Sequence, residues 1–249
     1  MIFKNASKFK LLSIYSFIIL SKNPLHSQNI NQSLIWYGIF TTYDFNKKWY
    51  FQNEFQERHF ISPIAQHQFI IRSHVHRNFP KAGMELSAGA SYFLQNSNNP
   101  NVQNTVTIPE RRPHIELGKK HALNKIQFEH RFRTEARFYR NTNSNKTELE
   151  DGYYFDNFRF RFRSQISVPI VKINQQNLLK IKISDEIHLH STKHRSTTYF
   201  DQNRVYVALN YEINKKANIE FGYLNWYQQK NATAFYNRNI ARFTLFHKI

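Results

Sequence analysis

The chain has 249 residues, with 35 Lys and Arg against 17 Asp and Glu, a formal net charge of +18, and 16% aromatic residues. Its 23 Phe and 14 Tyr supply enough apolar surface for a packed fold, which excludes an intrinsically disordered chain. It contains no cysteine, which excludes a disulfide scaffold, a thiolate metal site and a cysteine nucleophile. It also lacks the apolar run of about 18 residues that a membrane-spanning helix needs.

The N-terminal segment has the organisation of a secretory signal peptide. Its first ten residues carry three lysines and no acid, and the apolar run Leu11–Leu20 and a polar stretch follow. We expect cleavage after Ser27 or Gln28, so that residues 1–27 are removed; the alternative is a buried N-terminal helix. The remaining chain has 31 basic and 17 acidic residues and stays strongly basic.

Beyond this segment, apolar and polar side chains alternate with the two-residue period of a β-strand. The clearest stretch contains, in order, Phe158, Arg159, Phe160, Arg161, Phe162 and Arg163. A helix would spread these side chains around its circumference, whereas a strand places all phenylalanines on one face and all arginines on the other. This stretch therefore predicts a strand.

The same period predicts about eleven strands along the chain. They are Leu34–Tyr43, Lys48–Arg58, Gln68–Phe79, Met84–Gln95, Arg112–Gly118, Lys125–Tyr139, Tyr153–Val168, Leu179–His190, Gln202–Ile213, Ile219–Tyr227 and Arg242–Ile249. The pattern is less clean in the first, the fifth and the tenth of these. Many exceed the usual five or six residues and match the roughly 9 to 11 residues with which a tilted strand crosses a bilayer.

The connections alternate between short turns and long polar loops. Short turns are predicted at Phe45–Lys47, Pro80–Gly83, Lys119–His121 and Asn214–Ala217, and a longer one at Pro169–Asn177. Longer loops are predicted at Asn96–Glu110, Asn141–Gly152, Ser191–Asp201 and Lys230–Asn237. Turns at one rim and loops at the other are typical of a transmembrane barrel, whose short turns face the periplasm.

Alternation alone also fits a secreted soluble β-sandwich, which buries its apolar faces between two sheets. Strand length, the export signal and the dense arginine and glutamate ladders favour a single antiparallel transmembrane β-barrel of 10 to 12 strands over residues 28–249. Aromatic side chains near the strand ends are then candidates for the interfacial girdles. They are Trp36, Tyr37, Tyr43, Trp49, Tyr92, Tyr139, Tyr153, Tyr154, Tyr199, Trp226 and Tyr227.

An odd strand number conflicts with the even number usual in bacterial single-chain barrels. If the C-terminus lies in the periplasm, Leu34–Tyr43 starts on the outer side. Two solutions are open: this segment enters the lumen, giving ten strands, or an undetected break gives twelve.

Several motifs resemble an uncharacterised family of bacterial outer-membrane barrels of about this length. They are Trp36-Tyr37-Gly38, Lys47-Lys48-Trp49, Glu54–Arg58, Glu129–Arg137, Phe158–Arg161, Asp185-Glu186 and Asp201–Arg204. The resemblance covers nearly all of the chain after residue 27. It implies fold and location, the outer membrane of a Gram-negative bacterium, but no catalytic residue.

The polar faces of the strands supply the candidate site, a charge network inside the lumen. It comprises Glu54, Arg58, Arg72, Glu129, Arg131, Arg133, Glu135, Arg137, Arg159, Arg161, Arg163, Glu186, Gln202, Arg204 and Glu220. One interpretation is a salt-bridged lumen that fills and rigidifies the barrel. The other is a narrow conduit that prefers anions, because rings of arginine favour anionic solutes.

An enzyme is a further alternative, such as a lipid-modifying protein of the outer membrane. Glu186, His188 and His190 share one strand face and could bind a metal or act as acid and base, whereas Asp185 falls on the other face. No serine lies in a recognisable motif. We therefore assign no catalytic residue, cofactor or metal site.

The expected partners follow from the predicted location. They are outer-membrane lipids, which basic turns such as Lys119-Lys120 and Lys215-Lys216 would contact, the barrel-assembly machinery and small anions. Nucleic acid is not expected, because the positive charge is spread over every strand instead of forming one patch.

Overall fold

The structure, a computed structural model, describes residues 28–102, 106–173, 176–192 and 198–249, so the predicted signal peptide lies outside the described residues. Within the described residues no helix has the length and apolar character needed to cross a membrane. The one helical element among them is the short 3-10 helix η2 (Pro80–Ala82). The strands are β1 (Gln28–Asp44), β2 (Trp49–Phe60), β3 (Ala65–Phe79), β4 (Met84–Gln95), β5 (Ile108–Leu123), β6 (Ile126–Thr142), β7 (Leu149–Ile173), β8 (Gln176–His190), β9 (Phe200–Asn214), β10 (Ala217–Gln229) and β11 (Ala234–Lys248).

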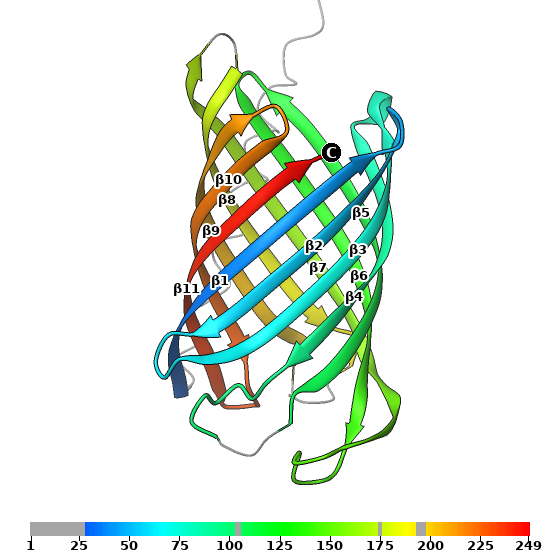
Figure 1. Cartoon of the computed structure of the whole chain (residues 1–249), viewed down its shortest axis with the longest axis vertical. Coiled ribbons are helices and arrows are strands. Elements are labelled where there is room, and N and C mark those ends of the chain that lie inside the picture. The colour runs from blue at the N-terminus through cyan, green and yellow to red at the C-terminus, as the bar shows by residue number, and fades with distance from the viewer. Residues whose placement is uncertain (1–27, 103–105, 174–175, 193–197) are drawn as a thin grey trace, which may run out of the picture.

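The strands form one closed barrel (Figure 1). Each strand pairs antiparallel with its neighbour in the chain, and β1 pairs in parallel with β11, from Gln28 opposite Ala234 to Thr42 opposite Lys248. The predicted all-β barrel is thereby confirmed, and its strand number lies within the expected range. The expectation of a purely antiparallel sheet was wrong, as were the ten-strand and twelve-strand solutions. With an odd number of strands, the first and the last point the same way and can close the wall only in parallel.

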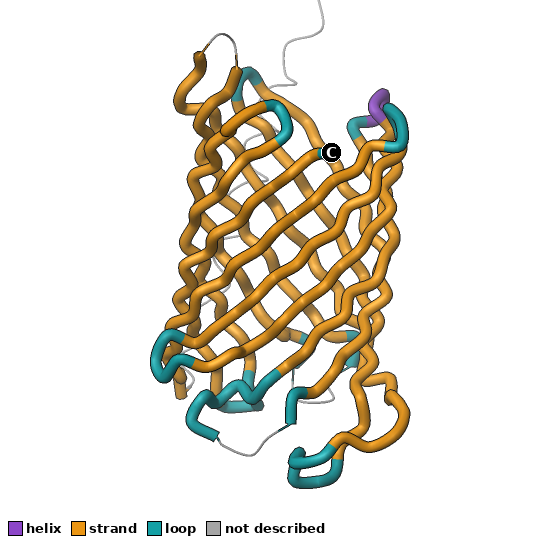
Figure 2. The backbone as a smooth tube through the Cα atoms, in the orientation of Figure 1, coloured by secondary structure: helices purple, strands orange, loops and turns teal. Residues whose placement is uncertain are grey.

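The two rims of the barrel differ in their connections (Figure 2). The turns after β1, β3, β5, β7 and β9 lie at one rim, here called the turn rim, with the C-terminus; the other connections and the start of β1 lie at the loop rim. The turn predicted at Lys119–His121 was wrong, because β5 continues to Leu123 and turns at Asn124, whose φ is 54°. The loop at 141–152 is also shorter than predicted, since β7 begins at Leu149, and β7 and β8 extend into most of the predicted turn at Pro169–Asn177.

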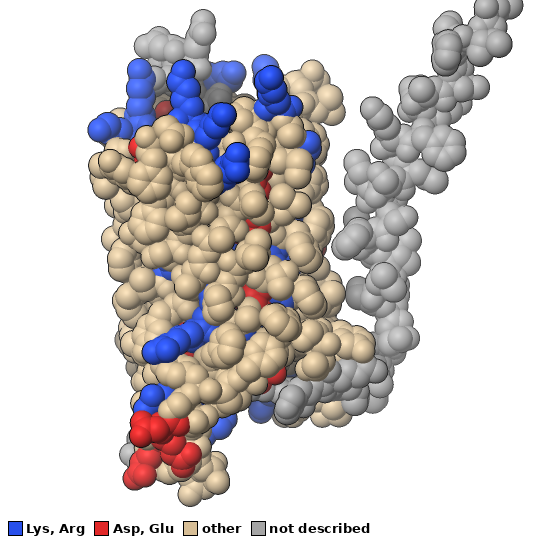
Figure 3. Space-filling view, turned by 90° about the vertical axis from the view of Figure 1, so that its right-hand side faces the viewer, with Lys and Arg blue, Asp and Glu red and all other residues tan. Residues whose placement is uncertain are grey.

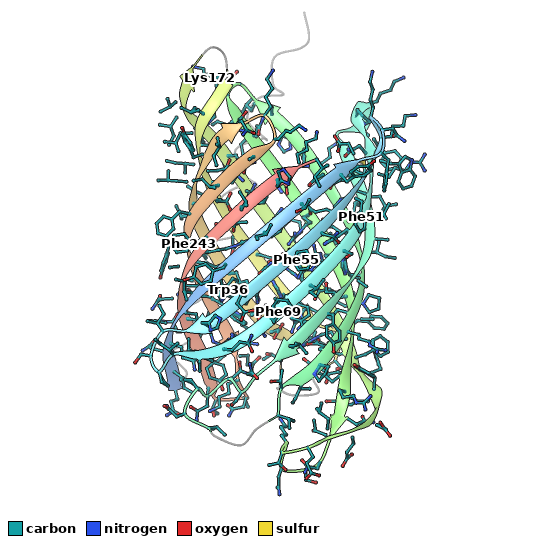
Figure 4. All side chains as sticks on the ribbon, viewed as in Figure 1. Trp36, Phe51, Phe55, Phe69, Lys172 and Phe243 are labelled. Carbon is teal, nitrogen blue, oxygen red and sulfur yellow. The ribbon has the colours of Figure 1, made fainter. Side chains whose placement is uncertain are left out.

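Large apolar side chains cover the outside of the wall (Figure 4). Phe55, Ile115 and Phe221 expose 43%, 62% and 53% of their surface, and Phe243 projects from the outer face. Side chains of opposite parity in the same strands point inward and are largely polar or charged. A soluble sandwich would bury the apolar faces between its sheets, so that alternative was wrong.

An apolar cluster lines the inner side of the seam where β1 meets β11. Leu34, Trp36 and Ile240 are buried there, and side chains from β2, β9 and β10 complete the cluster: Phe60, Tyr206, Ala208, Leu224 and Trp226. Gly222 is required in this packing, since a Cβ at that position would lie 2.5 Å from the Tyr206 ring. The cluster gives the closing pair of strands a packed inner face.

Three predicted girdle residues therefore lie inside the barrel. Trp36 and Trp226 expose 2% and 3% of their surface, and Tyr139 is also buried. The reason is register: Trp36 stands opposite Arg58, and cross-strand partners point to the same side of a sheet. Of the other girdle candidates, Tyr37, Tyr43, Trp49, Tyr92, Tyr154 and Tyr199 are exposed.

Candidate functional site: the charged interior

The fifteen residues predicted to form a lumen network lie on seven strands, β2, β3 and β6 to β10. Eleven of them are buried, and the other four, which are partly exposed, line an interior cavity: Glu129, Arg131, Arg163 and Arg204. Strand periodicity thus brings all fifteen to the inside of one closed wall, where most of them meet as ion pairs or hydrogen-bond partners.

The network centres on Arg161, which bridges two carboxylates. Its Nη1 donates to Oε1 of Glu135 at 2.6 Å and its Nη2 to Oε2 of Glu186 at 2.9 Å. Arg131 donates from Nη2 to the same Glu186 at 2.5 Å. Since buried charges are stable only when paired and hydrogen-bonded, these contacts fix the side chains across three strands.

A second cluster centres on Glu110 of β5, which was not predicted. Glu110 is fully buried and accepts bonds from Nε of Arg112 at 2.5 Å and from Nε of Arg137 at 2.6 Å. On the same strand Glu116 accepts from Nε of Arg133 at 2.6 Å. The two-residue alternation of Glu110, Arg112 and Glu116 was visible in the sequence, but neighbouring prolines and a polar loop obscured it.

The histidines proposed for an enzyme or a metal site are instead members of the network. Nε2 of His188 lies 3.0 Å from Glu186, and its Nδ1 lies 2.7 Å from the amide of Gln202. His190 pairs with Asp201 at 3.3 Å. In the described part of the chain, no group of three His, Asp or Glu side chains is placed to hold a metal ion.

The inward-facing arginines fall into two groups. Eight have a carboxylate within ion-pair distance: Arg72, Arg112, Arg131, Arg133, Arg137, Arg159, Arg161 and Arg163. Among the described residues, the other four form no ion pair and lie against aromatic rings: Arg58, Arg204, Arg238 and Arg242. All four come from β2, β9 and β11, on the side of the seam. On one side of the interior the arginines are therefore in direct ion pairs, and on the other they have no carboxylate of the described residues within ion-pair distance.

Two cavities lie along the barrel axis. The loop-rim cavity has a volume of about 380 Å³ and the turn-rim cavity about 330 Å³. Four arginines belong to the walls of both and mark the waist between them: Arg58, Arg72, Arg161 and Arg204. Ten Lys or Arg and a single acid, Asp201, line the loop-rim cavity. Ten Lys or Arg and six Glu line the turn-rim cavity.

The rims also differ in charge (Figure 3). Lysines gather at the turn rim: Lys47, Lys48, Lys81, Lys119, Lys120, Lys125, Lys172, Lys215, Lys216 and Lys248. At the opposite end the exposed acids Glu148, Glu150 and Asp151 form a negative patch at the start of β7 and just before it. The molecule is therefore electrically asymmetric along its axis.

These features define a class of protein: a closed β-barrel with an apolar outer surface and many charged side chains inside. Residues 34–237 match the family model described as protein of unknown function (DUF2490), and the chain belongs to this family. The predicted resemblance to an uncharacterised family is thus confirmed. A solved structure described as the NanC porin in a rhombohedral crystal form aligns over 78% of this chain and 81% of its own, at 11% identity and a TM-score of 0.48. No curated protein matches the sequence.

Proposed function

We propose that the protein is an outer-membrane β-barrel of a Gram-negative bacterium that admits small anions through a narrow, charged interior. The apolar outer face supports residence in a bilayer, because it would expose phenylalanine, isoleucine and valine side chains to water all round the wall. Eleven strands of 12 residues or more are long enough to cross its hydrocarbon core.

The orientation follows from the two rims. Short turns of bacterial outer-membrane barrels face the periplasm, so the turn rim with its lysines lies at the periplasmic leaflet. Lysines at a membrane surface attract anionic lipid head groups, each contributing about 1 kcal/mol near the surface. The loop-rim cavity then opens to the outside of the cell.

The charge of the loop-rim cavity carries the proposal. Six of the cavity's ten basic side chains pair with carboxylates. The other four form no ion pair among the described residues, and their positive charge attracts anions and repels cations: Arg58, Arg204, Lys146 and Lys230. We expect the waist arginines, three of which are buried, to restrict passage between the two cavities to small solutes.

The test is single-channel recording of the folded, full-length protein in planar bilayers with a potassium chloride gradient. A small conductance with a reversal potential on the chloride side is the expected result. Cation selectivity would contradict the proposal, and a complete lack of conductance would identify the filled interior as purely structural.

A lipid-modifying enzyme has less support from the geometry. Glu186 and His188 point into the barrel and bond to each other and to Arg161 and Gln202. Acyl chains in the membrane lie on the other side of the wall.

A further inference from the structure

Two of the arginines without an ion-pair partner, Arg58 and Arg204, lie against the same indole ring at the waist. The guanidinium carbon of Arg58 lies 3.7 Å from the centroid of Trp36, and that of Arg204 lies 5.6 Å from the same ring and 4.6 Å from Trp226. Both arginines belong to the walls of the two cavities. A solute moving between the cavities therefore passes both side chains.

The hydrogen bonds of Arg58 reach neutral groups only. Its Nη1 donates to Gln68 at 2.8 Å, and its Nη2 donates to Gln56 at 2.7 Å. These amide oxygens accept some of the hydrogen bonds that the guanidinium can donate, but they supply no negative charge.

The Glu186 carboxylate, opposite Arg204 on β8, pairs with Arg131 and Arg161, which leaves Arg204 without a direct ion-pair partner among the described residues. Within this part of the chain the Nε of Arg204 is also buried without a hydrogen-bond partner, as is Nε1 of Trp36. A guanidinium removed from water without a counter-charge is unfavourable. The waist thus combines two positive charges with unused donors, which is the composition of an anion-binding site.

We propose that Arg58 and Arg204 bind the carboxylate group of a small organic solute at the waist. This inference rests on the proposed anion conduit and names its solute class. Guanidinium groups pair with carboxylates in fork geometry, as Arg112 does with Glu110 in the same interior. Trp226 lines the loop-rim cavity and Tyr206 lines the turn-rim cavity, so each ring can give the body of an organic solute an apolar contact that an inorganic anion cannot use.

Binding is measured by tryptophan fluorescence of the folded, full-length protein in detergent micelles. Trp49→Phe removes the one tryptophan outside the interior and leaves Trp36 and Trp226 as reporters. Sodium butyrate is titrated against sodium chloride and sodium phosphate at constant ionic strength. A saturable change with butyrate, at concentrations at least several-fold below those needed for the two inorganic anions, is expected.

Variants at Arg204 test the assignment. Arg204→Gln should raise the half-saturation concentration of butyrate about tenfold, because charge-assisted hydrogen bonds are lost. Arg204→Lys keeps the positive charge inside the barrel, so this variant should fold. It loses the fork geometry of the guanidinium and should weaken butyrate binding several-fold. Arg77→Gln removes an equal charge from an exposed position and should leave binding unchanged.

The outcomes test the carboxylate site and the anion conduit independently. A parent protein without a saturable response, an Arg204→Lys variant that binds as the parent does, or phosphate binding equal to butyrate binding would overturn the carboxylate site. If those results accompany an anion-selective conductance, the proposed function stands without the site. Saturable butyrate binding in a barrel that does not conduct supports the site and rejects the conduit.

Discussion

Trp36 and Trp226 meet edge to face inside the barrel, with ring centroids 5.7 Å apart and ring planes at 70°, although β11 separates their strands. The contact therefore spans the inner side of the closing strand. Parallel pairing is slightly less stable per residue than antiparallel pairing, and the two indoles add apolar contact at the place where the wall has its one parallel ladder.

Trp36→Ala should destabilise the barrel by about 3 to 5 kcal/mol, as expected for a buried aromatic side chain reduced to alanine. The measurement is urea-induced unfolding of the protein folded in lipid vesicles. Trp49→Ala is the matched control, since Trp49 lies on the outer face near the turn rim and exposes 39% of its surface. Equal losses in the two variants would contradict the packing role of Trp36.

Glu110→Gln should lower the free energy of unfolding by about 3 to 5 kcal/mol, because it leaves Arg112 and Arg137 buried without this counter-charge. The same urea titration measures the loss. Asp151→Asn removes a fully exposed carboxylate that pairs with the partly exposed Arg140, and no measurable change is expected there. A Glu110→Gln barrel as stable as the parent would show that the interior does not depend on this pair.

A cysteine pair can test the parallel closure, since the natural chain has no thiol. Ile35 and Ala241 stand opposite each other across β1 and β11 on the outer face. The double variant Ile35→Cys/Ala241→Cys should form a disulfide on oxidation, visible as faster migration of the denatured protein on a gel. Ile35→Cys/Phe243→Cys is the control: its second cysteine lies about 6.6 Å farther along β11, and it should react poorly. Equal cross-linking of both pairs would reject the register.

Epitope tags can test the orientation. A tag inserted after Asn145, in the connection between β6 and β7, should bind antibody on intact cells. A tag after Lys215, in the turn between β9 and β10, should bind only after the outer membrane is permeabilised. The reverse pattern would place the turn rim outside the cell and refute the proposed orientation.

Asp201→Asn should make the conductance more selective for anions. Asp201 is the one acid among the residues described as lining the loop-rim cavity, and it pairs with Arg159 at 2.9 Å, so its neutralisation adds one uncompensated positive charge. The reversal potential in a chloride gradient should shift further toward the chloride value. An unchanged potential in a folded, conducting variant would show that this cavity does not set selectivity.

The sequence predicted the strands best where one face is apolar and the other charged. In β7, arginines alternate with phenylalanines, so the period and the inward face were both evident. In β1 and β10 both faces are apolar: Trp36 points inward and Tyr37 outward, and alternation could not assign them. The interior apolar cluster was missed for this reason.

The partners of individual charges could not be predicted from periodicity. Arg161 lies between Glu135 and Glu186, which are 26 and 25 residues away, and only the register of β6, β7 and β8 brings them together. Glu186 stands opposite Arg204 in the register of β8 and β9, yet its carboxylate pairs with Arg131 and Arg161, which periodicity could not show. The sequence predicts which side chains face the lumen, whereas the structure is needed to see which of them form ion pairs.

Ten of the eleven strand contacts in the wall are hairpins, in which the turn limits how the two strands can align. Between β1 and β11 there is no connecting turn, and about 200 residues separate partners such as Leu34 and Ile240. Alignment must there be selected by side-chain fit, because a slip of one residue would turn Leu34 and Trp36 to the outer face of the wall. Substitutions at this junction are therefore expected to produce misaligned barrels as well as weakened ones.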